Sequence, residues 1–109
     1  MILSKEQQTL MLLAQLSQEL KALTLWQSCR PSLKQMASTA PFHYDTLTLE
    51  QWLQFVFIRR MAVLIELGAD LPASCAIAPM AEESFRGMKL ANEKALLNVI
   101  LHMDQLLTR

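Results

Sequence analysis

The stretch that decides the fold is "TLEQWLQFVFIRRM", residues 48–61. Thr48 followed three residues later by Gln51 is a capping box, in which each side chain satisfies a backbone N–H group of the other residue. Glu50 adds negative charge in the first turn, where the helix dipole favours it. These signals predict a helix over residues 49–67 that stops at Gly68, because glycine readily adopts the left-handed conformation that ends helices.

This predicted helix is apolar around most of its surface. At about 100° per residue, one continuous arc collects eight apolar side chains: Leu49, Trp52, Leu53, Val56, Phe57, Val63, Leu64 and Leu67. Four more extend the apolar character beyond that arc: Phe55, Ile58, Met61 and Ile65. A helix with so little polar surface is expected at the centre of the fold.

Working outward, the same signals place the other helices. A Ser4–Gln7 capping box opens a helix over residues 5–26, and Pro79 opens a short one over residues 79–86. A further apolar face begins near residue 90 and continues toward the carboxyl end. The sequence predicts an all-α fold: one domain over residues 1–109, a compact antiparallel bundle of three long helices plus one or two short ones.

A long connection, residues 27–47, joins the first two long helices. Pro31 and Pro41 interrupt the helical pattern there, while Ser32 and Gln35 can cap one short turn. A connection of this length in a compact domain needs anchors. Four side chains are expected to pin it across the bundle: Leu33, Met36, Phe42 and Tyr44.

Composition excludes several classes of function. Ten basic residues balance ten acidic ones, so the long-range positive field of a general nucleic-acid binder is missing, and direct nucleic-acid binding is not expected. No apolar run approaches the roughly 20 residues that cross a bilayer, and the start "MILSKEQQ" lacks the apolar core of a signal peptide. We therefore expect no membrane partner and a cytoplasmic location.

No catalytic, metal or cofactor site is predicted. Cys29 and Cys75 are too few and too far apart for a zinc site or a disulfide framework, and His43 and His102 each lack a nearby second ligand type. Ser74 stands beside Cys75 without the local signature of a nucleophile. The aromatic side chains lie on or beside an apolar helix face, which indicates core packing and not a base-stacking platform. We expect a protein that is not an enzyme and has no cofactor.

The double arginine splits on the helical wheel. Arg59 projects outside the apolar arc, whereas Arg60 projects near its middle and needs an acceptor if it is buried. The candidate partners are Asp45, Glu82 and Glu83, which precede the central helix or open the short one. A structural ion pair is the first interpretation, with a partly exposed stem and a ligand-facing anion site as the alternatives.

At residues 38–61, "STAPFHYDTLTLEQWLQFVFIRRM", followed by "AIAP" at 76–79, the chain resembles the YqcC-like family of small bacterial proteins. The matching positions are Pro41, Phe42, Asp45, Thr46, Trp52, Leu53, Gln54, Phe55, Val56, Arg60, Met61, Ala76, Ala78 and Pro79. The resemblance implies a helical bundle, a family with no established molecular function, and a genetic association with a tRNA pseudouridine synthase. Arg59 stands where relatives have a proline, and Met80 and Ala81 stand where relatives have aromatic residues.

Two functional hypotheses follow. Leu90, Leu97 and Leu101 fall on the outer side of the last helix, and seven methionines add adaptable apolar contacts, so the first hypothesis is binding to another protein, such as an RNA-modification enzyme. Self-association stays open. The second is a small-molecule or anion-binding module centred on Arg60. Direct assistance in RNA binding would require four basic residues to converge: Arg30, Lys34, Arg59 and Arg86.

Overall fold

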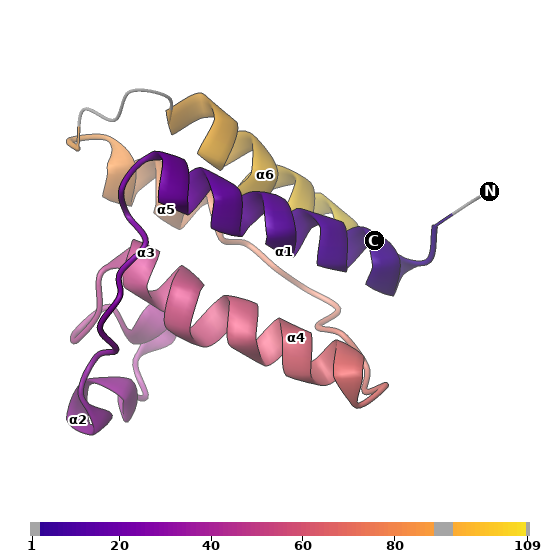
Figure 1. Cartoon of the computed structure of the whole chain (residues 1–109), viewed down its shortest axis with the longest axis horizontal. Helices are drawn as coiled ribbons and strands as arrows, with labels where there is room; N and C mark the ends of the chain where they lie inside the picture. Colours follow the sequence, from indigo (N-terminus) through magenta and orange to yellow (C-terminus); the bar gives the residue numbers. More distant parts are fainter. Residues whose placement is uncertain (1–2, 89–92, 109) are drawn as a thin grey trace.

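The computed structural model describes residues 3–88 and 93–108, which form helices and connections with no strand in either range. Figure 1 shows their arrangement. The elements in order are α1 (Lys5–Ala22), α2 (Leu33–Met36), the 3₁₀ turn η1 (Pro41–His43), α3 (Leu49–Trp52), the π-helical turn η2 (Leu53–Phe57), α4 (Ile58–Glu66), α5 (Ala78–Phe85) and α6 (Glu93–Leu107). The all-α prediction is confirmed.

Capping boxes start three of these helices, as the sequence predicts. At α1 the Ser4 amide donates to Gln7 Oε1 at 2.9 Å and the Gln7 amide donates to Ser4 Oγ at 3.1 Å. The same reciprocal pair opens α2 from Ser32 and α3 from Thr48. These interactions span three residues, so the local sequence is enough to specify them.

The helix ends agree less closely with the sequence. Gly68 has φ +67° and ends the central helix as predicted. However, α1 stops at Ala22 and not at residue 26, because Thr24 adopts φ +60° and the Leu25 amide donates back to the Leu20 carbonyl at 2.8 Å. This is the bond pattern of a Schellman ending with threonine in place of the usual glycine, which a search for glycine misses.

The central helix is continuous from α3 through η2 into α4, but it is not a uniform α-helix. Residues 53–57 form a π-helical turn, which contains one more residue than an α-helical turn. An extra residue rotates everything after it by about 100° relative to a straight α-helical wheel. The apolar arc predicted from that wheel is therefore rotated beyond Phe57.

Beyond η2 a different stripe faces the core. Met61 is buried, and Ile58 and Ile65 pack against the core. Of the three residues of the predicted arc in this part of the helix, Leu64 packs partly against the core as predicted, whereas the prediction is wrong for Val63 and Leu67, which are exposed. The prediction that Arg60 points into the apolar face is wrong for the same reason: Arg60 lies on the outward stripe with Val63 and is exposed.

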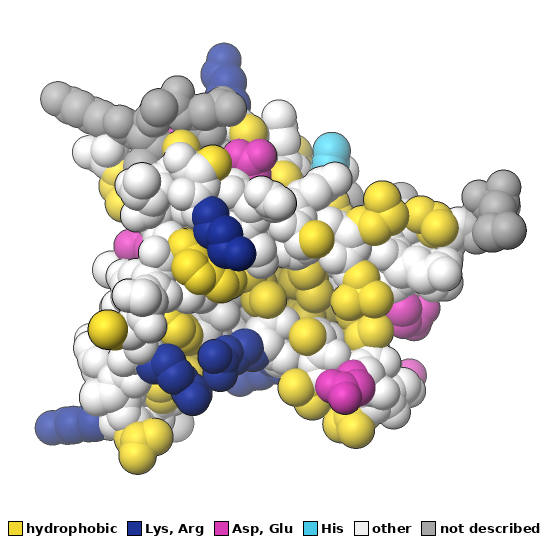
Figure 2. Space-filling view, viewed as in Figure 1, with side chains coloured by type: hydrophobic (Ala, Val, Ile, Leu, Met, Phe, Trp, Pro, Cys, Tyr) yellow, Lys and Arg dark blue, Asp and Glu magenta, His cyan; other side chains and the backbone are white. Residues whose placement is uncertain are grey.

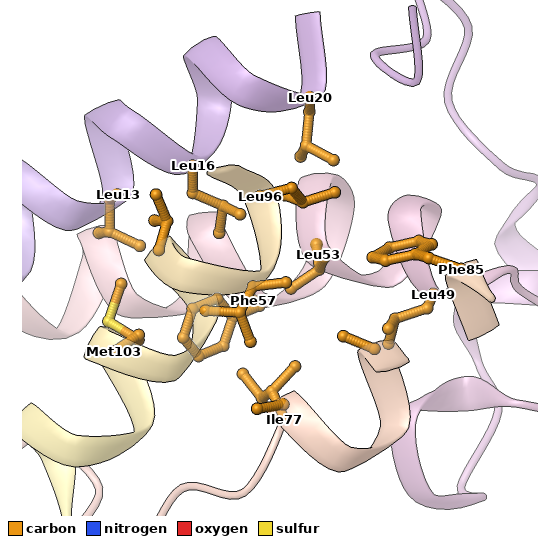
Figure 3. Packing of buried hydrophobic residues seen from close by; sticks show 14 of the residues in the cluster. Leu13, Leu16, Leu20, Leu49, Leu53, Phe57, Ile77, Phe85, Leu96 and Met103 are labelled. Atoms are coloured by element: carbon orange, nitrogen blue, oxygen red, sulfur yellow. The ribbon is translucent and has the colours of Figure 1, made fainter. Parts of the chain in front are cut away.

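One core joins the helices. In Figure 1, α1 and α6 lie side by side and run in opposite directions, with the central helix across from them and α5 between. Figure 3 shows the buried side chains from these elements meeting around Leu53 and Phe57. The fully buried members include Leu16, Leu20, Leu53, Met61, Phe85, Leu96, Ile100, Met103 and Leu107.

Two of the four predicted anchors hold the long connection. Phe42 packs edge-on against Trp52, with ring centroids 4.9 Å apart, and Met36 is partly buried, whereas Leu33 and Tyr44 are exposed. A polar contact that the sequence did not reveal also holds the long connection. The Gln54 side chain, buried on η2, accepts from the Gln27 amide and donates to the Gln27 carbonyl, both at 2.8 Å.

Candidate functional site

The residues predicted as an ion-pair or anion site do not come together. Asp45 is exposed and accepts a hydrogen bond from Ser38 Oγ at 2.5 Å. Glu83 lies 3.4 Å from Arg86, and this exposed pair is the single ion pair among residues 3–88 and 93–108. Glu82 is exposed as well. The predicted pairing of Arg60 with one of these carboxylates is therefore absent from the described residues.

The three leucines of the predicted interaction surface do not share one environment either. Leu101 is 43% exposed, whereas Leu97 packs partly against the core. Leu90 lies outside the described residues. Leu101 alone of the three is thus a described, solvent-accessible apolar side chain.

A buried polar centre forms around Asp104, a residue that the sequence analysis did not single out. Asp104, buried on α6, accepts hydrogen bonds from the Ile77 amide at 2.9 Å and from the Ala78 amide at 2.7 Å. One turn later, Thr108 Oγ1 accepts from the Cys75 amide and donates to the Cys75 carbonyl, both at 3.1 Å. Asp104 therefore caps the start of α5 from another helix.

Cys75 is held in this centre in a chemically inert form. Its Sγ donates to Asp104 Oδ1 at 3.1 Å. Burial, the hydrogen bond to Asp104 and the negative charge of that carboxylate raise the pKa of the Cys75 thiol from 9.0 to about 12. Because the thiolate is the nucleophile, a thiol that stays protonated at neutral pH is a poor candidate for catalysis.

A signal for Asp104 was present in the sequence. It lies one helical turn after Ile100 and one turn before Thr108, on the apolar face of α6. A carboxylate on such a face needs donors to offset its desolvation, by the same argument that singled out Arg60. The donors themselves lie 26 to 29 residues away, so only the fold identifies them.

Two hollows mark the surface of the described residues. The first, which we call the α1–α6 groove, has a volume of about 270 Å³ and is lined by Leu3, Gln8, Met11, Leu12, Gln15, His102, Gln105 and Leu106. Met11 is 53% exposed, and Leu101 lies one turn before Gln105 on the same helix. Figure 2 shows hydrophobic side chains on the right of the molecule, where the beginning of α1 lies.

The second hollow, which we call the Glu50 pocket, has a volume of about 340 Å³. It lies between the end of the long connection, the start of α3 and one face of α5. Its lining is Phe42, Tyr44, Leu47, Thr48, Leu49, Glu50, Met80, Ser84 and Met88. Met80 thus forms part of a pocket wall.

Basic side chains gather away from both hollows. Figure 2 shows Lys and Arg side chains together at the lower left, around α2 and the beginning of α4. The exposed basic residues of those segments are Arg30, Lys34, Arg59 and Arg60. Arg86 is engaged with Glu83 on α5. The described residues contain no group of three or more His, Cys, Asp or Glu side chains arranged to hold a metal ion.

Comparison with known proteins gives a consistent result. The model of the family DUF446, described as "tRNA pseudouridine synthase C", matches residues 8–106. An "Uncharacterized protein" of Haemophilus influenzae is 41% identical over 91% of this chain and 92% of its own length. The "Uncharacterized protein YqcC" of Escherichia coli is 40% identical over 52% of each chain. The solution NMR structure of E. coli YqcC aligns with a TM-score of 0.83 and 27% identity, over 97% of this chain and 90% of that one.

One further relative has a different size. The "tRNA pseudouridine synthase C" of Pectobacterium carotovorum is 36% identical over 72 residues. The match covers 66% of this chain but 19% of that protein, so most of the relative lies outside it. A segment similar to this chain is therefore part of a much longer polypeptide.

Proposed function

Because the chain belongs to the YqcC-like family, DUF446, we propose that it is a non-enzymatic helical-bundle protein that acts by binding a tRNA pseudouridine synthase. One observation carries the proposal: a segment similar to this chain forms a fifth of a longer protein with that name. Covalent linkage holds two modules at high effective concentration, which favours modules that act together. We propose that this module and the synthase act together by binding each other.

The α1–α6 groove is the surface that we assign to this contact. Its lining includes two exposed apolar side chains, Leu3 just before α1 and Met11 on α1, and the exposed Leu101 lies one turn before the lining residue Gln105 on α6. A concave apolar patch rimmed by amides, here Gln8, Gln15 and Gln105, is typical of a protein-binding surface. Methionine at its edge adds adaptability to the shape of the partner.

The chemistry of the polar centre supports a role other than catalysis. Asp104 is saturated by backbone donors and the Cys75 thiol, and it has no direct access to a substrate because it is buried. The alternative of an anion-binding module centred on Arg60 loses its structural argument. Arg60 is exposed and lines neither of the two hollows.

The test is binding between this chain and the pseudouridine synthase C of the same organism, each purified separately. We expect a complex by size-exclusion chromatography and calorimetry. Met11→Lys and Leu101→Lys are each expected to weaken it at least about tenfold, because each places an unpaired charge in an apolar contact. Leu67→Lys is the matched control, since Leu67 is 74% exposed but lies on α4, away from the groove.

Two results would count against the proposal. Absence of a complex at micromolar concentrations of both proteins would exclude the pseudouridine synthase as the partner. If all three variants weakened the complex equally, or if none weakened it, the α1–α6 groove would be excluded as the binding surface. Concentration-dependent self-association of this chain, abolished by Met11→Lys, would instead assign the groove to a second copy.

A further inference from the structure

Glu50, a mostly buried acidic residue that lines the Glu50 pocket, has no side-chain partner among the described residues. Glu50 is 8% exposed and lines the pocket, yet no described side chain or backbone amide donates a hydrogen bond to it and no described cation lies within ion-pair distance. Every fully enclosed side-chain nitrogen or oxygen in residues 3–88 and 93–108 has a partner. The Glu50 oxygens are therefore not fully enclosed by the protein.

The pocket has walls suited to an apolar stem. Leu47, Met80 and Met88 contribute aliphatic and thioether surface; Met80 and Ser84 lie one turn apart on α5, and Met88 follows three residues after its end. The hydroxyl groups of Tyr44 and Ser84 also form no hydrogen bond within the described residues. As lining residues of the same pocket, they offer additional acceptors.

The charge of Glu50 selects the class of ligand. A carboxylate without a partner repels anions and gains most from a charged donor, because charge-assisted hydrogen bonds are about twice as strong as neutral ones. A divalent metal would need several more oxygen ligands than one carboxylate, and no such group surrounds Glu50 in the described residues. A volume of about 340 Å³ is in the range of small-ligand sites.

We propose that the Glu50 pocket binds a primary ammonium group on a short apolar stem. This is the chemistry of an aliphatic amine and of a lysine side chain. The carboxylate accepts from the ammonium group while the stem lies against Leu47, Met80 and Met88. The pocket shares no lining residue with the α1–α6 groove, so this inference is independent of the proposed function.

Titration of the full ¹⁵N-labelled chain with n-butylammonium chloride tests the proposal by NMR. We expect saturable shifts at the amides of residues 48–50 and 84, with a Kd on the order of 1 mM for so small a ligand. n-Butanol and sodium butyrate, which share the stem, are expected to bind at least about tenfold more weakly. Glu50→Gln is expected to abolish the preference for the amine, and Glu66→Gln, an exposed carboxylate on α4, is expected to leave it unchanged.

The ligand comparison keeps the test informative even if Glu50→Gln alters folding. Equal binding of butanol and butylammonium by the wild-type chain, or no saturable shift with either, would overturn the proposal. Lys89 follows Met88 in the sequence, so Lys89→Ala serves as a further control. Amine binding that appears in this variant alone would show that the chain supplies its own cation. That result would also overturn the proposal.

A second probe separates the two sources of the ligand. Nα-acetyl-lysine N-methylamide presents the same ammonium group on a peptide backbone. Tighter binding of this compound than of butylammonium would assign the pocket to a lysine of a partner protein. Equal or weaker binding would assign it to a free amine, and both outcomes depend on Glu50.

Discussion

At the scale of single residues, Asp104 shows how one side chain can position two helices. Its carboxylate accepts from two consecutive backbone amides at the start of α5 and from the thiol of Cys75. The first amides of a helix have no partner within the helix, and Ile77 offers no side-chain cap of its own. Without Asp104 these buried donors would be left unpaired, at a cost of about 1–3 kcal/mol each.

This role predicts the effect of removing the carboxylate. Asp104→Ala should lower the free energy of unfolding by about 3–5 kcal/mol, and Asp104→Asn by about 2 kcal/mol, because asparagine retains one acceptor oxygen. Urea unfolding measures both. Asp70→Asn, at an exposed position in the connection before α5, is the control and should change stability by less than about 0.5 kcal/mol. Equal effects at the two positions would contradict the capping role.

The raised pKa of Cys75 predicts a dependence of stability on pH. The folded thiol titrates at about 12 and the unfolded thiol near 9.0, so the folded state favours the protonated form. The resulting stabilisation is present below pH 9 and is lost as the pH rises from 9 toward 12. The difference in unfolding free energy between wild type and Cys75→Ala, measured at intervals across this window, should shrink as the pH rises. A difference in unfolding free energy that stayed constant across this pH window would contradict the prediction.

The two cysteines should also differ in reactivity. Cys29 is exposed, whereas Cys75 is partly buried with its thiol held protonated. Iodoacetamide at pH 8 should therefore modify Cys29 well before Cys75, because alkylation proceeds through the thiolate. Mass spectrometry of the digested protein measures the two rates. Comparable rates in the folded chain, or faster modification of Cys75, would be incompatible with the Asp104–Cys75 contact.

At the scale of elements, the π-helical turn decides which side of α4 meets the core. A straight α-helix would place Arg60 among the apolar side chains, whereas the extra residue in η2 turns Met61 inward and Arg60 outward. The same turn places Gln54 where it can bind the backbone at Gln27. Arg59 lies within α4 and is exposed.

Adjacent substitutions test this register directly. Met61→Ala should cost about 2–5 kcal/mol of stability, because it leaves a cavity at a position that is 1% exposed. Arg60→Ala should change stability by less than about 0.5 kcal/mol, as is usual for exposed side chains without a partner contact. Thermal or chemical unfolding of the two variants provides the comparison. A larger loss of stability in Arg60→Ala than in Met61→Ala would instead support the register of a straight α-helix.

At the scale of the whole molecule, charge is balanced in total but uneven in place. The chain has ten basic and ten acidic residues, yet Lys and Arg side chains gather around α2 and the beginning of α4 (Figure 2). No helix in the described part of the chain combines the length and apolar character needed to cross a membrane. A local basic region on a neutral chain is a weak electrostatic attractor at physiological salt, where screening acts over about 8 Å.

This balance predicts that the chain alone does not retain tRNA at about 0.15 M salt. A gel-shift titration with total tRNA measures it, and the pseudouridine synthase serves as the positive control. Binding that falls steeply with salt and is lost on Arg30→Glu or Arg59→Glu would contradict the expectation. It would then assign the basic region to nucleic acid.

The sequence by itself determined the helical class, the three capping boxes and the stop at Gly68, because each depends on residues within one turn of one another. Tertiary structure alone decided the register of α4, the roles of Gln54 and Asp104, and the exposure of Arg60. The side of a helix that faces the core depends on the rotation of the backbone along the helix. The π-helical turn η2 adds one residue to that rotation. The partners of Gln54 and Asp104 lie 26 to 29 residues away, beyond the reach of any local pattern.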